Sequence, residues 1–268
     1  MYLILGIGGT HTRIGLSIDG QSIIHSSKVY TNKNFDQAMA EIKQTVDGLG
    51  VPREIQQIVV GVAGILNQDK RSLFHSPYLP DWDNKPLSER MSQIFSAPCA
   101  LHNDAELEGL AEATRGAGQT HKIVGYLVVG TGLGGARIVE GKVDQSAFGM
   151  EPGHQLLTLD EDNSIEEWEQ LVSGTAIEKI TGHKAKELDD PKTWELLSKR
   201  FAIGLHNTIV HWSPNIVVIS GSVGKRLDLE AVKRTLAKTL TIYPHLPEIV
   251  FGTLGDEAAL LGGLQVAT

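Results

Sequence analysis

Two turns rich in glycine and threonine are the segments of this chain best suited to chemistry. The first is Gly8-Gly9-Thr10, and the second is Gly130-Thr131-Gly132-Leu133-Gly134-Gly135. Glycine lets the backbone approach an anion closely, so that successive N–H groups point into one concavity, and a threonine hydroxyl adds a further donor. Either turn alone also fits an ordinary tight hairpin. The matched pair favours a site that holds the phosphates of a nucleotide from both sides.

Neither turn follows the standard nucleotide-binding patterns. No Gly-Lys-Ser/Thr sequence ends either turn, and a strand-like run, not a helix, follows each one. An isolated Asn103-Asp104 lies between the two turns, directly after the strand-like run 99–102. We expect a helix to begin at Asn103-Asp104, where an acidic residue complements the positive end of the helix dipole.

The two turns belong to a unit that occurs twice, about 120 residues apart. In each copy an apolar run precedes the turn, a second apolar run follows it, and a short polar turn leads to a third strand-like run. The first copy covers 2–5, 13–16 and 22–24, and the second covers 124–129, 136–139 and 142–143. The chain therefore carries a duplicated strand–turn–strand–turn–strand unit.

The spacing of apolar residues predicts the remaining elements. Predicted helices cover 34–49, 86–95, 164–180, 191–212, 229–240 and 257–266, and further strands cover 55–63, 99–102, 216–219 and 248–251. Strand triplets followed by alternating helices and strands, twice over, predict an α/β fold with two related lobes.

Composition limits the class of partner. The 268 residues are 41% hydrophobic and 21% charged, with a net charge of −8, which argues against nucleic-acid and anionic-membrane partners. No apolar stretch approaches the ~18 residues of a membrane span, and the first apolar run lacks the basic flank of a signal peptide. The single cysteine, Cys99, has no partner for an internal disulfide, so we expect a cytoplasmic protein in which Cys99 has a packing role.

These features together resemble the ROK family (repressor, open reading frame, kinase) of sugar kinases in the actin-like ATPase superfamily. The resemblance covers essentially the whole chain, with its segments in the expected order. The matching segments are Ile7–Thr10, Gly61–Gly64, the loop from Pro77 to Trp82, Asn103-Asp104, Gly130–Gly135, Met150–His154, Glu169–Gly174 and Ser220–Val223. One segment departs slightly, because Met150 stands where the family usually has glycine.

The resemblance implies a two-lobed α/β fold of the actin-like ATPase (ribonuclease H-like) type. It is built from a duplicated βββαβα unit with a cleft between the lobes. We expect residues 1–104 and 256–268 to form a small N-terminal lobe and residues 105–255 to form a larger C-terminal lobe. The family also leads us to expect a homodimer.

The resemblance also implies the roles of individual residues. Asp104 would be the catalytic base that accepts a proton from a sugar hydroxyl, for which we expect the 6-OH. The expected sugar-binding residues are Gly64, Asn103, Asp104, Glu151, His154 and Glu169. The expected nucleotide-binding residues are Gly8, Gly9, Thr10, Thr12, Gly130, Thr131, Gly132, Gly134, Gly221 and Ser222. ATP would bring Mg²⁺ with it, and His154, which follows Pro-Gly, also fits a simple turn cap.

Two departures from the family pattern affect the expected chemistry. Many members bind a structural zinc through cysteines after the Gly-His segment together with its histidine, but residues 155–168 contain no cysteine. We therefore expect no structural zinc, which leaves His154 for the sugar. The family's first segment also normally begins with an aspartate near the phosphates, and Gly6 stands at that position. Loss of one such preorganised group lowers rates by roughly 10²–10³.

The sequence thus predicts an ATP-dependent hexose kinase with a small-molecule sugar substrate, and Gly6 keeps one alternative open. That alternative is a non-catalytic sugar- or nucleotide-binding protein on the same fold. A repressor of this family would need a DNA-binding element before the first strand, and this chain begins at that strand. Glucose, fructose, mannose and N-acetylated hexosamines all remain candidates, because they differ at only one or two positions.

Overall fold

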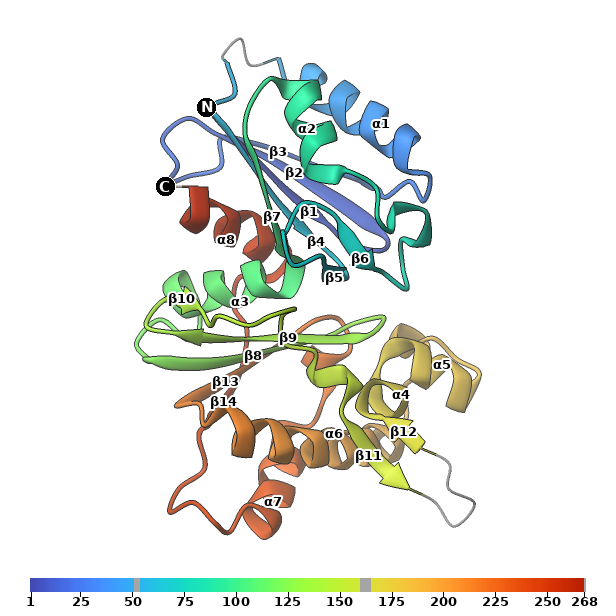
Figure 1. Ribbon diagram of the computed structural model, residues 1–268. Helices are drawn as coiled ribbons and strands as arrows, with labels where there is room; N and C mark the ends of the chain where they lie inside the picture. The colour runs from blue at the N-terminus through green and yellow to red at the C-terminus, as the bar shows by residue number, and fades with distance from the viewer. Residues whose placement is uncertain (51–53, 160–164, 268) are drawn as a thin grey trace. The chain divides into compact units, whose positions relative to one another are not determined.

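The computed structural model describes residues 1–50, 54–159 and 165–267. The chain folds as two compact units (Figure 1). Unit 1 consists of Met1–Ala111, Gln145–Gly149 and Asp256–Thr268, and unit 2 consists of Glu112–Asp144 and Met150–Gly255. This division falls after Ala111, whereas the sequence placed it after Asp104, and it adds the segment Gln145–Gly149 to unit 1.

Unit 1 is built on a five-stranded sheet in the order β3-β2-β1-β4-β7. Its strands are β1 (Tyr2–Ile7), β2 (His11–Ser17), β3 (His25–Tyr30), β4 (Gln57–Val62) and β7 (Cys99–Asn103). Strands β1, β4 and β7 run parallel, with Ile7 beside Val62 and Val62 beside Asn103. The segments that follow these three strands therefore emerge at the same edge of the sheet.

Alternating apolar residues fill the two faces of this sheet. On one face, Leu3 and Leu5 of β1 pack in a buried cluster with α1 (Phe35–Gly48) and α2 (Leu87–Phe95). On the other, Ile4 of β1 packs in a cluster with residues of α3 (Asp104–Arg115) and α8 (Ala258–Ala267). Figure 1 shows α8 on the opposite face of the sheet from α1 and α2. Asn34 begins α1 by accepting a hydrogen bond from the Gln37 N–H, as the predicted helix 34–49 requires.

Unit 2 repeats the same sheet in the order β10-β9-β8-β13-β14. Its strands are β8 (Ile123–Val129), β9 (Leu133–Val139), β10 (Lys142–Val143), β13 (Ile216–Ser220) and β14 (Glu248–Phe251). Strand β8 pairs antiparallel with β9 and parallel with β13, as β1 pairs with β2 and β4 in unit 1. The predicted duplication of a mixed α/β unit is therefore confirmed.

Four helices provide most of the remaining core of unit 2. They are α4 (Trp168–Val172), α5 (Gly174–Thr181), α6 (Pro191–Trp212) and α7 (Leu229–Thr239). Helix α6 has the bounds that its apolar spacing predicts, with Asp190 as the N-cap and Pro191 as the first helical residue. Helices α4 and α6 meet where the ring centroids of Trp168 and Phe201 lie 5.0 Å apart.

The predicted helix 164–180 is wrong in part; its first residue, Ser164, lies outside the described residues. Ile165–Glu167 forms a short strand, β12, which pairs antiparallel with β11 (Leu156–Leu159). A helix begins only at Trp168, with Glu167 as its N-cap residue, and it ends at Val172. Ser173 follows, and its hydroxyl caps the next helix. The third strand of the first repeat also differs from the prediction, because it begins at His25 and not at Ser22.

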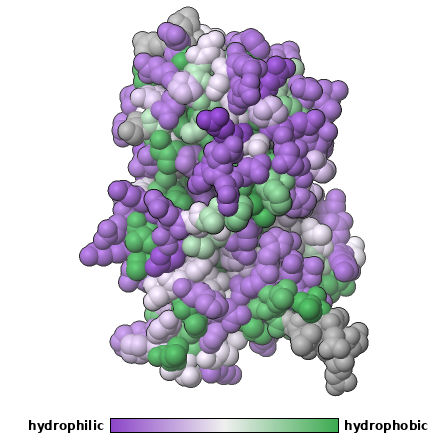
Figure 2. All heavy atoms as spheres, viewed as in Figure 1, coloured by the Kyte–Doolittle hydropathy of each residue, from purple (hydrophilic) through white to green (hydrophobic). Residues whose placement is uncertain are grey.

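The other elements are short. They are β5 (Ile65–Leu66), β6 (Leu73–His75) and the 3-10 turns η1 (Pro80–Trp82), η2 (Pro152–His154), η3 (Ala185–Glu187), η4 (Gly224–Arg226) and η5 (Gly255–Glu257). Hydrophilic residues cover most of the face drawn in Figure 2, with small hydrophobic areas among them. Within the described residues, no helix has both the length and the apolar character to cross a membrane.

The close packing of α6 on α4 gives a direct test of this core. A Cβ atom at Gly204 would lie 2.2 Å from the Trp168 ring, so we expect Gly204→Ala to lower the free energy of unfolding by about 1–3 kcal/mol. Gly48→Ala is the matched control, because nothing lies within 4 Å of a Cβ there and alanine favours the helix. Urea unfolding measures both variants, and equal stability of the two would contradict the packing.

Candidate functional site

The first glycine turn leaves two backbone donors without partners. The Gly8 N–H donates to the His11 carbonyl at 3.0 Å, and Thr31 binds both ends of the turn through its hydroxyl to Gly8 O and its N–H to Thr10 O. Within the described residues, the N–H groups of Gly9 and Thr10 have no hydrogen-bond partner. Consecutive free N–H groups in a glycine turn suit an anionic ligand.

Two side chains support this first turn. Thr12 is buried, and its hydroxyl lies 3.0 Å from the hydroxyl of Thr31, so it braces the turn from the core side. The Lys33 ammonium donates to the carbonyls of Gly9 and Tyr78 and thereby places a positive charge at the turn. The sequence analysis missed Lys33, because a single lysine in a loop carries no local signal.

The second glycine turn has the same arrangement. The start of α5 binds its carbonyl groups, since the Gly174 N–H donates to Gly130 O at 2.7 Å and the Thr175 N–H donates to Thr131 O at 3.2 Å. The Gly130 N–H is taken by the Gly132 carbonyl at 2.9 Å. Among the residues that the structure describes, the N–H groups of Thr131 and Gly132 remain unpaired. Gly134, the other expected nucleotide ligand here, lies within β9 beside Val128.

The Gly221-Ser222 turn lies next to this second turn in unit 2. Strands β8 and β13 are parallel, with Ser220 beside Val128, so the turns that follow them lie at the same edge of the sheet. Gly221 has a φ of +88°, and a Cβ there would lie 2.2 Å from the Val129 carbonyl oxygen, so only glycine fits. Ser222 is exposed.

Asn103 joins two parts of the predicted sugar-binding group in unit 1. Its side-chain oxygen accepts from the N–H groups of Ala105 and Glu106 at 2.8 and 3.2 Å and so caps α3. Its amide nitrogen donates to the Gly64 carbonyl at 3.1 Å. Gly64 has a φ of +130°, a conformation that favours glycine. The structure thus brings together Gly64, Asn103 and Asp104 at the ends of β4 and β7.

Asp104 is the first residue of α3 and has the properties of a base near neutral pH. Burial raises the pKa of its carboxyl group to about 6, although the hydrogen bond from the Ala105 N–H opposes this effect, and the nearby Glu106 charge adds to it. A carboxylate with this pKa is ionised at pH 7 and binds a proton more readily than an ordinary aspartate.

Gly6 faces the helix that covers the back of β1. A Cβ atom at Gly6 would lie 3.0 Å from the Cβ of Ala259 on α8 and 4.0 Å from the Cβ of Arg13 on β2. Arg13 already pairs with Asp256 at 2.7 Å. Gly6 therefore permits a close contact between β1 and α8, in addition to removing the expected carboxylate.

In unit 2, the predicted sugar ligands His154 and Glu169 lie close together. Their ligand atoms and those of Glu167 are all within 4.8 Å of one another. His154 Nδ1 lies 3.0 Å from Glu167 Oε2, and Glu169 Oε2 accepts from the Leu133 N–H at 3.2 Å. The last bond ties Glu169 to the second glycine turn. The sequence analysis missed Glu167, because a glutamate of the Glu166-Glu167 pair has no feature of its own.

This group does not match the family's zinc site. The only cysteine, Cys99, lies on β7 of unit 1, and burial raises the pKa of its thiol to about 12. An imidazole and two carboxylates can bind a divalent cation in principle. Here, however, both carboxylates already accept hydrogen bonds from the protein, at 3.0 and 3.2 Å. We therefore interpret the group as hydrogen-bonding side chains.

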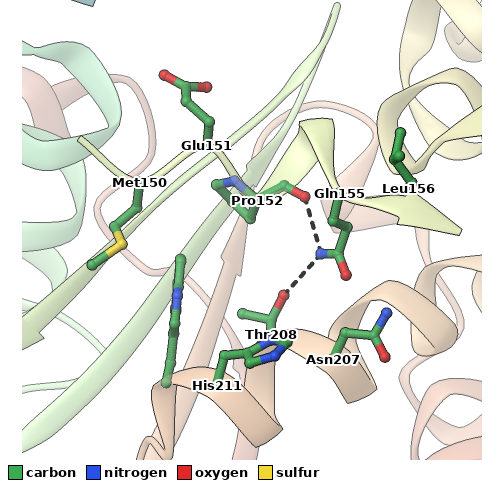
Figure 3. A pocket seen from close by; sticks show the side chains of 9 residues that line it. Met150, Glu151, Pro152, Gln155, Leu156, Asn207, Thr208 and His211 are labelled. Carbon is green, nitrogen blue, oxygen red and sulfur yellow. Dashed lines mark hydrogen bonds between the residues drawn. The ribbon is translucent and has the colours of Figure 1, made fainter. Parts of the chain in front are cut away.

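A pocket of about 300 Å³ in unit 2 adjoins the segment that carries Glu151 and His154. The Gln155 amide crosses its wall, donating to the Pro152 carbonyl at 3.0 Å and to the Thr208 hydroxyl at 3.2 Å. Figure 3 shows the Glu151 carboxylate pointing away from Gln155 and Thr208. Because Gln155 anchors the turn Pro152–His154 to α6, we assign this wall a supporting role.

Comparison with known proteins finds glucokinases among the proteins similar to this chain. Part of the chain is 30% identical to a glucokinase of Streptomyces coelicolor over 185 residues, which is 67% of this chain and 58% of that protein. A ROK family glucokinase from Streptomyces griseus, solved in complex with glucose and AMPPNP, has a TM-score of 0.83 at 23% identity over 99% of this chain and 98% of that one.

The same fold also occurs in a protein of another class. A ROK family transcriptional regulator, a homologue of the E. coli MLC protein, has a TM-score of 0.82 at 16% identity and covers 99% of this chain and 77% of its own. The family model for ROK matches residues 2–268. The α/β fold with two five-stranded sheets, the free donors of both glycine turns and this match lead to one conclusion: the chain belongs to the ROK family.

Proposed function

We propose that this protein is an ATP-dependent hexose kinase that transfers the γ-phosphoryl group of Mg-ATP to a sugar hydroxyl. The observation that carries the proposal is the Asp104 carboxylate, whose pKa is raised to about 6 at the start of α3, beside Asn103 and Gly64. A carboxylate with this raised pKa can take up the proton of a sugar hydroxyl, in addition to accepting a hydrogen bond from it. The proposed protein works in the cytoplasm, and we expect a homodimer.

In the proposed reaction, the sugar 6-OH attacks the γ-phosphorus of ATP, and the bond from that phosphorus to the β–γ bridging oxygen breaks. Asp104 accepts the proton of the hydroxyl, and ADP leaves with the bridging oxygen. General-base catalysis of this kind contributes roughly 10²–10⁴-fold. Most of the remaining acceleration comes from positioning and from neutralising the phosphate charge.

The free N–H pairs of Gly9-Thr10 and Thr131-Gly132 are the proposed phosphate donors. Thr10 and the Gly221-Ser222 turn complete the proposed nucleotide-binding group, and Lys33 adds positive charge at the first turn. Asn103 and Gly64 in unit 1, and Glu151, His154 and Glu169 in unit 2, are the proposed sugar ligands.

A non-catalytic sugar-binding protein is the second candidate, and Gly6 favours it. The glycine lacks the carboxylate that the family places near the phosphates, and α8 occupies part of the space that such a side chain would need. Glucose, fructose, mannose and N-acetylated hexosamines all remain open as the sugar.

The primary test is sugar-dependent ADP release from Mg-ATP over a hexose panel, with Asp104→Asn as the comparison. We expect Asp104→Asn to lower turnover roughly 10²–10⁴-fold and to leave sugar affinity nearly unchanged. The variant should also be more stable at pH 7 by roughly 1–3 kcal/mol, because folding no longer buries a charge. Unchanged turnover would show that Asp104 is not the base.

The raised pKa also predicts a pH dependence. Because Asp104 must be ionised to accept a proton, kcat/KM should fall tenfold per pH unit below about pH 6 and level off above it. The contribution of Asp104 to folding stability changes with pH in the opposite direction to the reaction rate. The folded state binds the extra proton between pH 3.8 and about 6, so this contribution to stability is lost as pH rises through that range. A flat profile from pH 5 to 7 would contradict the assignment.

The role of Gly6 needs a substitution that respects α8. We expect Gly6→Asp alone to lower the free energy of unfolding by about 1–3 kcal/mol, since its Cβ would press on Ala259. The double variant Gly6→Asp/Ala259→Gly removes that contact, and we expect its turnover to rise by up to roughly 10²–10³-fold. Ala259→Gly alone is the control. A folded double variant with unchanged turnover would show that the missing carboxylate does not limit the rate.

A further inference from the structure

The imidazole of His154 is held at one nitrogen and open at the other. Nδ1 lies 3.0 Å from Glu167 Oε2. An ionised carboxylate can only accept a hydrogen bond, so Nδ1 must carry the proton that joins them. Within the described part of the chain, Nε2 has no hydrogen-bond partner, and about half of the His154 side chain is exposed. The bond to Glu167 therefore decides which nitrogen faces a ligand.

Glu167 itself is fixed by the start of α4. It is the N-cap residue, and its side chain accepts from the Gln170 N–H while the Gln170 side chain accepts from the Glu167 N–H at 3.1 Å. This reciprocal pair is a capping box, which holds both side chains in place. The same short helix carries Glu169, so one element sets the position of a proposed sugar ligand and of the partner of another.

The charges around His154 come from three elements of unit 2. Burial lowers the pKa of the imidazole, but the hydrogen bond to Glu167 and the charges of Glu169, Glu167 and Glu151 outweigh it, so the pKa lies above its usual value. These glutamates lie on β12, on α4 and directly before η2. Removing one negative charge from this group must lower the pKa of His154.

We propose that Glu167 is a positioning residue for sugar recognition, which fixes the tautomer and orientation of His154 so that Nε2 meets a sugar hydroxyl. This inference rests on the proposed function, in which His154 binds sugar. With Nδ1 protonated, neutral His154 presents a lone pair at Nε2 to a hydroxyl donor. Protonated His154 presents a donor there instead. Glu167 thus has two roles: it caps α4, and it fixes the hydrogen-bonding character of His154 Nε2 toward the sugar.

The test uses Glu167→Gln, with Glu166→Gln as the matched control. Glutamine at 167 keeps the side-chain length and one acceptor oxygen but removes the charge, and its NH2 group cannot accept the second hydrogen bond. Residue 166 precedes it on the same strand, so its side chain points to the other face. The readouts are ring ¹⁵N NMR of His154 across pH, calorimetric affinity for each hexose of the panel, and the separate effects on KM and kcat.

We expect Glu167→Gln to lower the pKa of His154 and to weaken hexose binding roughly tenfold or more, by analogy with the partners that orient metal-binding imidazoles. KM should rise with little change in kcat, and the pH at which affinity changes should move downward. Glu166→Gln should leave all of these values unchanged.

Three results would overturn the proposal. The first is hexose affinity in Glu167→Gln equal to that of the native chain, which defeats the positioning role alone. The second is hexose affinity that disappears with EDTA and returns with Zn²⁺, since a cation would then hold His154. The third is a native chain that binds no hexose although NMR shows the Nδ1-protonated ring; that result defeats the proposed function and this inference with it.

Discussion

The N–H groups left unpaired at the ends of β1 and β8 are the constraint on which the rest of the structure depends. A backbone donor without a partner is costly unless water or a ligand satisfies it, so each turn must stay open while its other polar groups are fully bound. Thr31 does this for the first turn, and the start of α5 does it for the second. Both turns follow the middle strand of a five-stranded sheet, which supplies the rigidity.

The sequence predicts best those elements whose own apolar residues determine their position. Helix α6 carries a long apolar pattern on one buried face, and strand β13 is a short run that is buried throughout, so the position of each follows from its apolar residues alone. The hairpin β11–β12 does not, because Ile165 is exposed and the strand is three residues long. Its boundary with α4 is set by the capping box of Glu167 and Gln170, which a helical spacing cannot reveal. Lys33 and Glu167 were missed for a related reason, since each matters only through a distant contact.

Gly6 shows how packing and chemistry can depend on one position. Helix α8 approaches β1 so closely that a Cβ at Gly263 would lie 2.2 Å from Ile4, and one at Gly6 would lie 3.0 Å from Ala259. Gly263 makes room for the Ile4 side chain, whereas a side chain at Gly6 would have room only if α8 moved or Ala259 became smaller. The absence of a carboxylate at Gly6 is therefore linked to the small residues of α8, and its effect on catalysis has to be judged with that helix in view.

The surroundings of Asp104 and His154 both raise the pKa, but they act oppositely on the charged form. They destabilise the Asp104 carboxylate and stabilise the His154 imidazolium. Burial raises the pKa of Asp104, which makes it a stronger base at a cost in stability. Carboxylates raise the pKa of His154, which stabilises the charged form of the ring. Proton acceptance needs a group whose charged form is destabilised, whereas recognition of a hydroxyl needs one that is held in place by its neighbours. The two units thus divide these tasks, with the proposed base on unit 1 and the held imidazole on unit 2.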